Sequence, residues 1–452
     1  MGGLSARRSI ELESGLAPCA AMHYPRARPS PWVVRRRLVK PGGARERMTG
    51  CWRRTGGAAR PTCRLRPQDV LSSRRGRRRF TNLRPTTDGL PMASVDAKTR
   101  PPNVDLGALL LTGATGEIGS HLVLRLNAAG IAPAALLRRP LPPGAWRGAQ
   151  ATEVPGDLEQ LAGSKPLPAL ERTLGRTRTL VHLAARVNLR GRGAAEMQRI
   201  NVRAATELFR RAQAAGVRRF VHVSTTGAVG CNDRPVPLTE AAPYNLTRFR
   251  NPYFETKRAA EERLQALWRE SPSSTDLIIV NPSINIGPQA SFRRRAGTRR
   301  RRPPPHPGRW PYRLVCFWFT GGINLVDVRD VAEGILLAAE HGTAGQRYIL
   351  AGENLTIRQL MARLQPVFGT AGPRVRLPHW TLRAAGSLAE AVASRTGRRA
   401  VWNRSLAALC GPYWFYDSAR AREALGYAPR PFGDTLAELR AWISERARAT
   451  VA

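Results

Sequence analysis

The sequence lacks the cysteine patterns that bind zinc or build a disulfide framework. It has six cysteines, with no Cys-x-x-Cys pair and no histidine at metal-ligand spacing from them: Cys19, Cys51, Cys63, Cys231, Cys316 and Cys410. No apolar run reaches the roughly 18 residues that a membrane-spanning helix needs. These absences predict a protein of the reducing cytoplasm, with no metal site and no membrane span.

Acidic residues and lysines are also scarce. The chain has 32 acidic against 73 basic residues, only 4 of them lysine, and a net charge of +41. Such a surplus is typical of nucleic-acid binders. However, residues 1–91 hold 21 basic and 5 acidic residues, and 291–313 hold nine arginines and no acid. Blocks of like charge broken by proline and glycine are typical of disordered segments, so nucleic acid is not the partner we expect.

The basic N-terminal segment permits three interpretations: an organelle transit peptide, a nucleic-acid-binding arm, or translated sequence upstream of the true start. Transit peptides are poor in acid, whereas Glu11 and Glu13 come early here. Met92 opens an ordinary polar lead into the first predicted strand. We therefore favour a start at Met92 and assign residues 1–103 to a disordered Arg/Pro-rich extension.

A glycine-rich turn follows the first apolar run. The stretch 109–120, LLLTGATGEIGS, carries Gly113, Gly116 and Gly119 and continues as an amphipathic segment. This pattern predicts strand, tight turn and helix. Glycines let the backbone approach a pyrophosphate, and the helix offers it unpaired N–H groups, so the turn predicts a dinucleotide site. The spacing differs from the commonest Gly-x-Gly-x-x-Gly fingerprint, and a glycine turn without ligand remains the alternative.

Two residues at predicted strand ends indicate which parts of a dinucleotide the protein would contact. Arg138 ends the strand predicted at 134–137, where an acid would bind a ribose 2′-hydroxyl and an arginine accommodates a 2′-phosphate. This favours NADP(H) over NAD(H), with a solvated surface arginine as the alternative. Asp157 follows the third predicted strand, where it would meet the adenine edge, cap the next helix, or do both.

Hydroxyl groups and a Tyr-x-x-x-Lys pair carry the predicted chemistry. The strand at 220–223 delivers Ser224 and Thr225 at its carboxyl end, where open α/β sheets bind ligands. Tyr253 and Lys257 share one face of a predicted helix. A phenol titrates near pH 10, so it needs a nearby cation to exchange protons near neutrality. His222 alternates with apolar strand positions, and we expect it to be structural.

The motifs TGATGEIG, LVHLAA, VHVSTTGAVG, YFETK and VNPSINIGP together resemble the extended and atypical short-chain dehydrogenase/reductases. This is the NAD-dependent epimerase/dehydratase group, and the chain is most similar to dihydroflavonol-reductase-like proteins and hopanoid-associated sugar epimerases. The resemblance covers about residues 106–444. It implies that Tyr253 is the general acid or base, Lys257 its cationic partner and ribose anchor, and Thr225 the group that binds the reacting oxygen.

The resemblance implies further site residues. Ser224 is the alternative to Thr225, Asn201 matches an asparagine that holds water or supports the site, and Asn281 with its successors would meet the nicotinamide end. The expected cofactor contacts are Gly113, Thr115, Gly116, Glu117, Ile118, Gly119, Arg138, Asp157, Leu158, Leu183, Ala184, Ala185, Val223, Tyr253, Lys257, Pro282, Ser283 and Ile284.

One stretch departs from the family pattern. Residues 289–310 contain SFRRRAGTRRRRPPPHPGRW where relatives have a helix leading to the substrate pocket. Polyproline and polyarginine cannot continue a core helix. The segment is a disordered insertion, a nucleic-acid or membrane-surface patch, or a local reading-frame error, and we favour the last.

We therefore expect an α/β protein with a doubly wound parallel Rossmann sheet at 104–288, an Arg/Pro-rich insert at 289–313 and a smaller α/β substrate-binding part at 314–448. Aromatic residues of this last part would line an apolar pocket or belong to the core: Trp380, Trp402 and Trp414.

Three functions follow from these expectations. The first is an NADP(H)-dependent oxidoreductase of a small carbonyl or alcohol substrate, as a monomer or homodimer. The second is a nucleotide-sugar epimerase or dehydratase that retains NAD. The third is a non-catalytic NAD(P)-binding regulator whose basic segments bind nucleic acid, a role that leaves the Tyr-Lys-Thr set unexplained.

Overall fold

The computed structural model describes residues 108–288 and 317–451, except 147, 273, 370–371, 398–399 and 401. All described residues belong to one compact unit. The predictions for the extension at 1–103, for a start at Met92 and for the insert at 289–313 lie outside the described residues.

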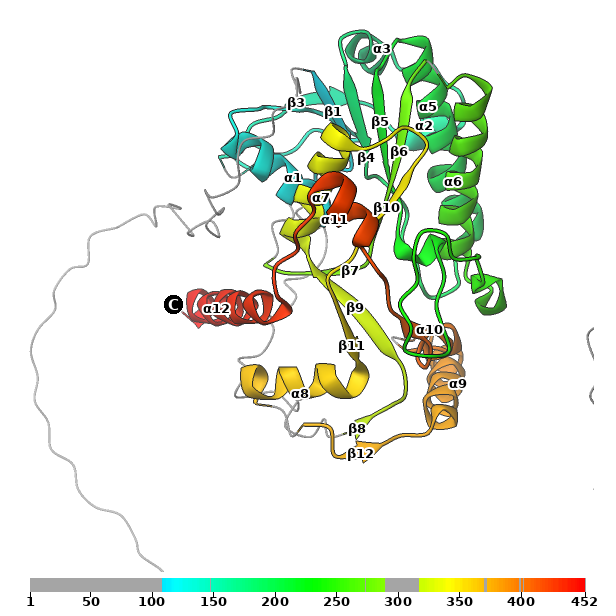
Figure 1. Cartoon of the computed structure of the whole chain (residues 1–452), viewed down its shortest axis with the longest axis vertical. Helices are drawn as coiled ribbons and strands as arrows, with labels where there is room; N and C mark the ends of the chain where they lie inside the picture. Colours follow the sequence, from blue (N-terminus) through cyan, green and yellow to red (C-terminus); the bar gives the residue numbers. More distant parts are fainter. Residues whose placement is uncertain are drawn as a thin grey trace, which may run out of the picture. The chain divides into compact units, whose positions relative to one another are not determined.

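Seven parallel strands form the main sheet, in the order β10-β6-β5-β4-β1-β2-β3 (Figure 1). The strands are β1 (Leu109–Thr112), β2 (Ala134–Leu137), β3 (Thr152–Pro155), β4 (Thr179–His182), β5 (Arg219–Val223), β6 (Asp276–Pro282) and β10 (Arg347–Leu350). The first strand, β1, is central, and β2 and β3 lie on one side of it. The chain then returns to the other side of β1, where β4, β5 and β6 follow in order. This order is the doubly wound topology that the sequence predicts.

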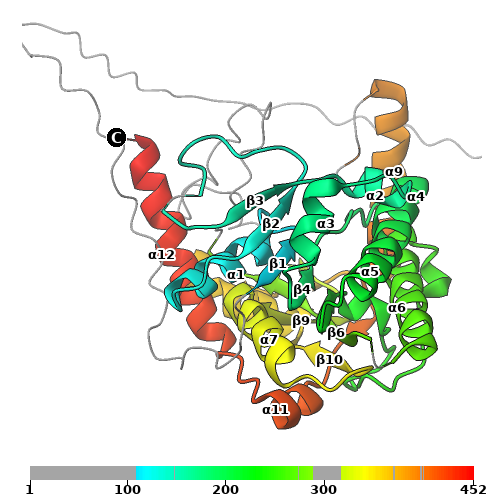
Figure 2. The same ribbon diagram turned by 90° about the horizontal axis from the view of Figure 1, so that it is seen from above.

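Helices cover both faces of this sheet (Figures 1 and 2). One face carries α1 (Glu117–Ala128), α7 (Val328–His341) and α11 (Ala419–Leu425), and the other carries α2 (Leu158–Ala162), α3 (Pro168–Leu174), α5 (Ala205–Ala214) and α6 (Pro252–Glu270). Successive strand residues divide between the two cores: Leu109 and Leu111 pack in the first and Leu110 in the second. Strands buried on both faces explain the continuous apolar runs in the sequence.

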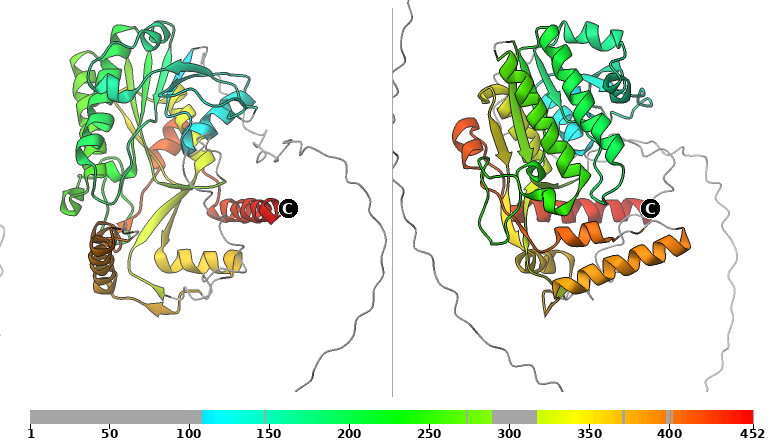
Figure 3. Two further views of the ribbon diagram at one scale, coloured as in Figure 1. Left: turned by 180° about the vertical axis from the view of Figure 1, so that it is seen from behind. Right: turned by 90° about the vertical axis from the view of Figure 1, so that its right-hand side faces the viewer.

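A second, smaller sheet extends from the carboxyl end of β6. It consists of β7 (Ile284–Ile286), β9 (Gly322–Asp327), β11 (Glu353–Thr356) and β13 (Tyr413–Trp414). The helices of this part are α8 (Ile357–Phe368), α9 (His379–Thr396), α10 (Arg404–Leu409) and α12 (Phe432–Val451) (Figure 3). Strands β8 (Phe317–Trp318) and β12 (Val375–Arg376) pair with each other and form a separate two-stranded ribbon. The later part of the chain also completes the main sheet through β10 and α7, so the boundary at 288 stays a prediction.

The helix that the sequence predicts through Asn201 is not regular. It begins as α4 (Ala194–Met197), widens into a π-helical segment η1 (Gln198–Ala204), and continues as α5. Such π segments often occur at functional sites, because the extra residue per turn changes the direction of a side chain. Asn201 lies in this segment and is buried.

His222 lies in the core, opposite His182 on the neighbouring strand. Their rings stack with centroids 5.5 Å apart, and Nδ1 of His182 is 2.7 Å from the Thr112 hydroxyl. Burial lowers the pKa of His182 to about 3 and that of His222 well below its usual value, and the charge of Lys257 lowers both further. Two neutral, packed rings agree with the structural role predicted for His222.

We predict that Gly119→Ala destabilises the fold. A Cβ at Gly119 would lie 2.2 Å from the Gly113 carbonyl oxygen, so α1 would have to move away from β1. Overpacking of this kind costs about 3 kcal/mol in free energy of unfolding. Chemical denaturation measures it, with Gly433→Ala as the matched control, because a Cβ there meets nothing within 4 Å. Equal stability of both variants would contradict the close packing of α1 on the turn.

Candidate active site

The glycine turn lies between β1 and α1 and contacts the loop after β4. Gly113 has φ +74°, a conformation that favours glycine, and a Cβ there would lie 2.8 Å from the Ala184 nitrogen. Gly116 is the N-cap residue of α1, which has no side-chain capping bond. The half-buried residues Thr115, Glu117, Ile118, Leu183, Ala184 and Ala185 surround this turn. Glycine at Gly113 therefore lets the turn pack closely against the loop after β4, and contact of the turn with a pyrophosphate stays a prediction.

The two residues predicted to contact the nucleotide follow β2 and β3. Arg138 is exposed directly after β2, the neighbour of β1 in the sheet. Asp157 is the N-cap of α2 and accepts a hydrogen bond from the Glu159 backbone N–H at 3.1 Å. The capping role proposed for Asp157 is thus observed, whereas its contact with adenine, and that of Leu158, stays a prediction.

Tyr253 and Lys257 lie on the first turns of α6, as the sequence predicts. Asn251 caps this helix by accepting from the Tyr253 backbone N–H at 3.1 Å, and Pro252 takes the first helical position. The Thr225 side chain lies near the Tyr253 phenol. Burial raises the pKa of Tyr253 to about 12, and the nearby Thr225 side chain lowers it in part. The phenol is therefore protonated near neutral pH, and an effect of Lys257 on its pKa stays a prediction.

Lys257 is buried and donates from Nζ to the Val223 carbonyl oxygen at 2.8 Å. Burial lowers its pKa to about 8, while the negative charge of Glu261 raises it. The ammonium thus binds the end of β5 at the residue that precedes Ser224. This contact ties the helix that carries Tyr253 to the strand that carries Thr225.

Asn281 forms a second tie to the end of β5. Its amide nitrogen donates to the Thr225 carbonyl oxygen at 2.9 Å and to Glu261 Oε1 at 2.7 Å. The other Glu261 oxygen lies 3.0 Å from an Arg347 nitrogen. Sequence reasoning missed Glu261 and Arg347. Glu261 stands four residues after Lys257 and hence on the same helix face, which is the one signal that would have found it.

The remaining predicted catalytic residues are buried. The Ser224 hydroxyl has no hydrogen-bond partner among the residues that the structure describes. Asn201 accepts from the Arg186 backbone N–H at 2.7 Å and donates to the Arg186 carbonyl and the Thr256 hydroxyl at 3.0 and 3.2 Å. It therefore fixes the loop after β4 to α6, in agreement with a supporting role.

The residues from Asn281 to Ile284, at and after the end of β6, differ in exposure. Asn281 is fully buried and uses its amide within the protein, and Ser283 donates to Asn324 Oδ1 on β9 at 2.6 Å. Ile284 is 49% exposed. Contact with the nicotinamide end stays a prediction for Pro282, Ser283 and Ile284.

Tyr253 packs against an apolar cluster. The cluster and the side chains packed against it are Leu189, Cys231, Tyr244, Leu246, Phe249, Tyr253, Phe254, Leu409 and Trp414. The rings of Tyr253 and Phe254 lie 5.7 Å apart, and those of Phe254 and Trp414 5.5 Å apart. Of the three tryptophans considered from the sequence, Trp414 is therefore the one in this cluster. Trp402 bonds the Leu382 carbonyl oxygen, and Trp380 is 69% exposed.

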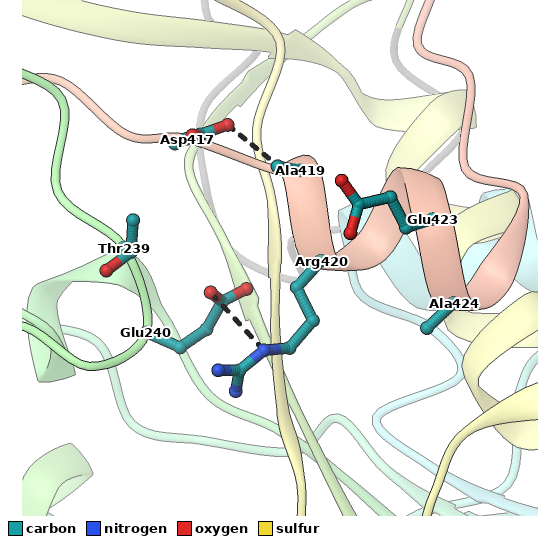
Figure 4. A pocket seen from close by; sticks show the side chains of 7 residues that line it. All are labelled: Thr239, Glu240, Asp417, Ala419, Arg420, Glu423 and Ala424. Carbon is teal, nitrogen blue, oxygen red and sulfur yellow. Dashed lines mark hydrogen bonds and ion pairs between the residues drawn. The ribbon is translucent and has the colours of Figure 1, made fainter.

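A cavity of about 330 Å³ lies elsewhere, between the loop at Thr239 and Glu240 and the helix α11 (Figure 4). Arg420 of α11 reaches across it to Glu240, with 3.8 Å between the charged atoms. No predicted site residue lines this cavity. In the described parts of the chain, moreover, no group of three or more potential ligands is placed to hold a metal ion.

The comparisons with known proteins agree with this geometry. Residues 109–351 match the model of the "NAD dependent epimerase/dehydratase family". The chain belongs to this family. The predicted resemblance is thereby confirmed, and the matched region begins at β1 and ends just after β10.

Three family relatives extend the comparison. Sterol demethylase protein B of Methylococcus capsulatus is 31% identical over 75% of this chain and 98% of its own. A putative dihydroflavonol 4-reductase of Synechocystis is 28% identical over 74% and 93%. A Stigmatella aurantiaca ketoreductase, named for a 4-farnesyl-dihydroquinoline-1-oxide substrate, is 30% identical over 71% and 91%.

Solved structures share the fold. The crystal structure of gox2253 has a TM-score of 0.59 and 29% identity, over 75% of this chain and 99% of that one. A dTDP-glucose 4,6-dehydratase from Streptomyces venezuelae, solved with NAD bound, has a TM-score of 0.54 and 24% identity, over 75% and 98%. The chain thus has the fold of nucleotide-dependent family members.

We predict that stability rises with pH between about 8 and 10 because of Lys257. Its pKa is about 8 in the folded protein and 10.5 as an ordinary lysine, so within this window the unfolded state binds more protons. Below pH 8 Lys257 is charged in both states, so the folded protein carries the full free-energy cost of burying the ammonium. Above pH 8 the buried lysine loses its proton, and this cost decreases. Lys257→Met should remove about 2 kcal/mol of this rise in the free energy of unfolding.

Denaturant titrations at several pH values measure the effect. Lys165→Met is the matched control, because Lys165 is exposed and its variant should keep the rise of the unchanged protein. A pH dependence that is the same in both variants would contradict the burial of a titrating ammonium at Lys257.

Proposed function

We propose that this chain is an NAD(P)-dependent oxidoreductase that interconverts an apolar ketone or aldehyde and the corresponding alcohol. The single observation that carries this proposal is the position of Tyr253 near Thr225, on a helix that Lys257 ties to the end of β5. It brings a proton donor and a second hydroxyl together at the carboxyl end of β5, the edge of the sheet where α/β folds bind ligands.

The residues around the glycine turn fit a dinucleotide. Gly116 is the N-cap residue of α1, and no side chain caps the first turn of this helix. Arg138 would bind a 2′-phosphate, and this favours NADP(H) over NAD(H). When bound, the nicotinamide supplies or accepts the hydride.

Side chains of this protein transfer the proton and hold the substrate oxygen. In the direction of reduction, Tyr253 donates a proton to the substrate oxygen, and the Thr225 hydroxyl holds that oxygen. Lys257 would stabilise the phenolate that remains and bind a ribose hydroxyl. Ser224 is the alternative to Thr225, and Asn201 keeps the loop after β4 against α6.

An apolar substrate is supported by two observations. Tyr253 packs against an apolar cluster to which Phe254, Leu409 and Trp414 also belong. The named substrates of several relatives are also lipid-like, since one relative is a sterol demethylase protein, one acts on a farnesyl compound and one is a ceramide reductase of Caulobacter vibrioides. A nucleotide-sugar epimerase or dehydratase that retains NAD remains the second candidate, although its structural relatives support the fold alone.

The predictions of a cytoplasmic location and of a homodimer belong to this proposal. A non-catalytic regulator is not favoured, because it gives no role to the presence of Tyr253, Thr225 and Lys257 together.

We expect Tyr253→Phe to abolish turnover and leave cofactor binding nearly intact. Loss of a general acid lowers kcat by about 10³-fold, whereas the Kd for NADPH should change by less than about threefold. NADPH oxidation with a panel of a steroid ketone, a long-chain aldehyde and a farnesyl ketone gives the rates, and fluorescence titration gives the Kd. Tyr427→Phe is the control, because Tyr427 is buried in the core and its hydroxyl has no protein partner. Unchanged turnover of Tyr253→Phe would refute the role.

The cofactor preference is tested at Arg138. Arg138→Ala should weaken NADPH binding by about tenfold, because one charge-assisted bond to phosphate is lost, and should leave NADH binding unchanged. Calorimetric titrations with both nucleotides measure this. Arg172→Ala, an exposed arginine on α3, should alter neither affinity. Equal loss for NADPH and NADH in Arg138→Ala would exclude 2′-phosphate recognition by this residue.

A further inference from the structure

Large exposed apolar side chains are concentrated at one end of the described unit. Eight such residues occur in the described parts, and five of them lie on β8, β12 and α9: Phe317, Val375, Trp380, Leu388 and Val392. We call these five residues the α9 surface. Figures 1 and 3 show the three elements together, far from α3. A contiguous apolar surface rarely stays in water, so this concentration indicates a binding function.

Helix α9 has two apolar faces. Its inner face packs on α10, where a Cβ at Gly386 would lie 2.9 Å from the Asn403 carbonyl carbon. Its outer face carries Trp380, Leu388 and Val392 at intervals of eight and four residues, which places them along one side of the helix. These three are 69%, 67% and 50% exposed. Since an ordinary surface helix is apolar on one face only, the outer face has no structural purpose within this unit.

The adjoining ribbon continues the apolar surface. Val375 of β12 pairs with Phe317 of β8, so their side chains leave the ribbon on the same face. They are 52% and 45% exposed. Two further exposed side chains therefore accompany the start of α9, and the surface includes more than one helix.

The charges around the α9 surface are positive. Four exposed arginines lie between 374 and 397: Arg374, Arg376, Arg383 and Arg395. The single acid in that stretch, Glu390, lies on the inner side and pairs with Arg404 at 3.2 Å. A tryptophan, aliphatic side chains and flanking arginines form the composition with which a helix lies in the headgroup region of an anionic membrane.

We propose that the α9 surface docks this protein on anionic phospholipid bilayers, with the axis of α9 in the plane of the membrane. None of the helices in the described ranges combines the length and the apolar character that crossing a bilayer requires, so attachment is peripheral. From α9 the chain passes through α10 to β13, which bring Leu409 and Trp414 to the apolar cluster at Tyr253. A substrate dissolved in the membrane would thus enter beside this path. The docking itself requires no catalytic activity.

The experiment is vesicle flotation of the full-length protein in about 0.5 M salt, where long-range attraction to arginines elsewhere in the chain is screened. Vesicles contain phosphatidylcholine with about one third phosphatidylglycerol. The unchanged protein should float with the vesicles. Trp380→Ser/Leu388→Ser should lower the partition coefficient by at least about tenfold, because both side chains insert among the lipids. Arg383→Gln/Arg395→Gln should lower it less, and more in low salt.

Val236→Ser is the matched control for Leu388→Ser, because Val236 is 53% exposed on a loop outside the α9 surface. It should bind as the unchanged protein does. The proposal is overturned if Trp380→Ser/Leu388→Ser floats as well as the control, or if high salt alone abolishes binding of the unchanged protein. It is also overturned if sedimentation velocity finds a dimer that this double variant dissociates, since a second copy would then cover the surface. Flotation measures no turnover, so failure of the proposed function would leave its outcome unaffected.

Discussion

The site depends on how the end of β5 is held. Lys257 donates to the Val223 carbonyl and Asn281 to the Thr225 carbonyl, so two buried side chains from different elements fix three consecutive residues of the strand end. Glu261 joins both, because it accepts from Asn281 and its charge favours the protonated lysine. With this strand end fixed, the Thr225 side chain lies near the Tyr253 phenol.

These contacts require charges to be buried. The carboxylate of Glu261 pairs with Arg347 at 3.0 Å, and its charge also raises the pKa of Lys257 against the larger effect of burial. The histidines beside them lose their charge instead, since burial lowers the pKa values of His182 and His222.

Local patterns predicted a large part of the fold and of the site. The glycine turn, the strand end at Ser224 and Thr225, and the pairing of Tyr253 with Lys257 each depend on residues near one another in sequence. Period and spacing reveal such features. The bonds of Asn281 and Arg347 to Glu261 join residues 20 and 86 positions apart, and only the packing of β6 and β10 against α6 brings them together. The π segment at Asn201 and the exposed side of α9 also depend on tertiary packing, which a single sequence does not display.

The central claim is that Tyr253 and Thr225 act as one unit on the substrate oxygen. A double-mutant cycle on kcat/KM for NADPH-dependent ketone reduction, with Tyr253→Phe, Thr225→Val and the double variant, measures their coupling directly. If the two hydroxyls act together, the double variant is scarcely slower than Tyr253→Phe alone. Losses that simply multiply would show that the two groups act independently, and would contradict the account.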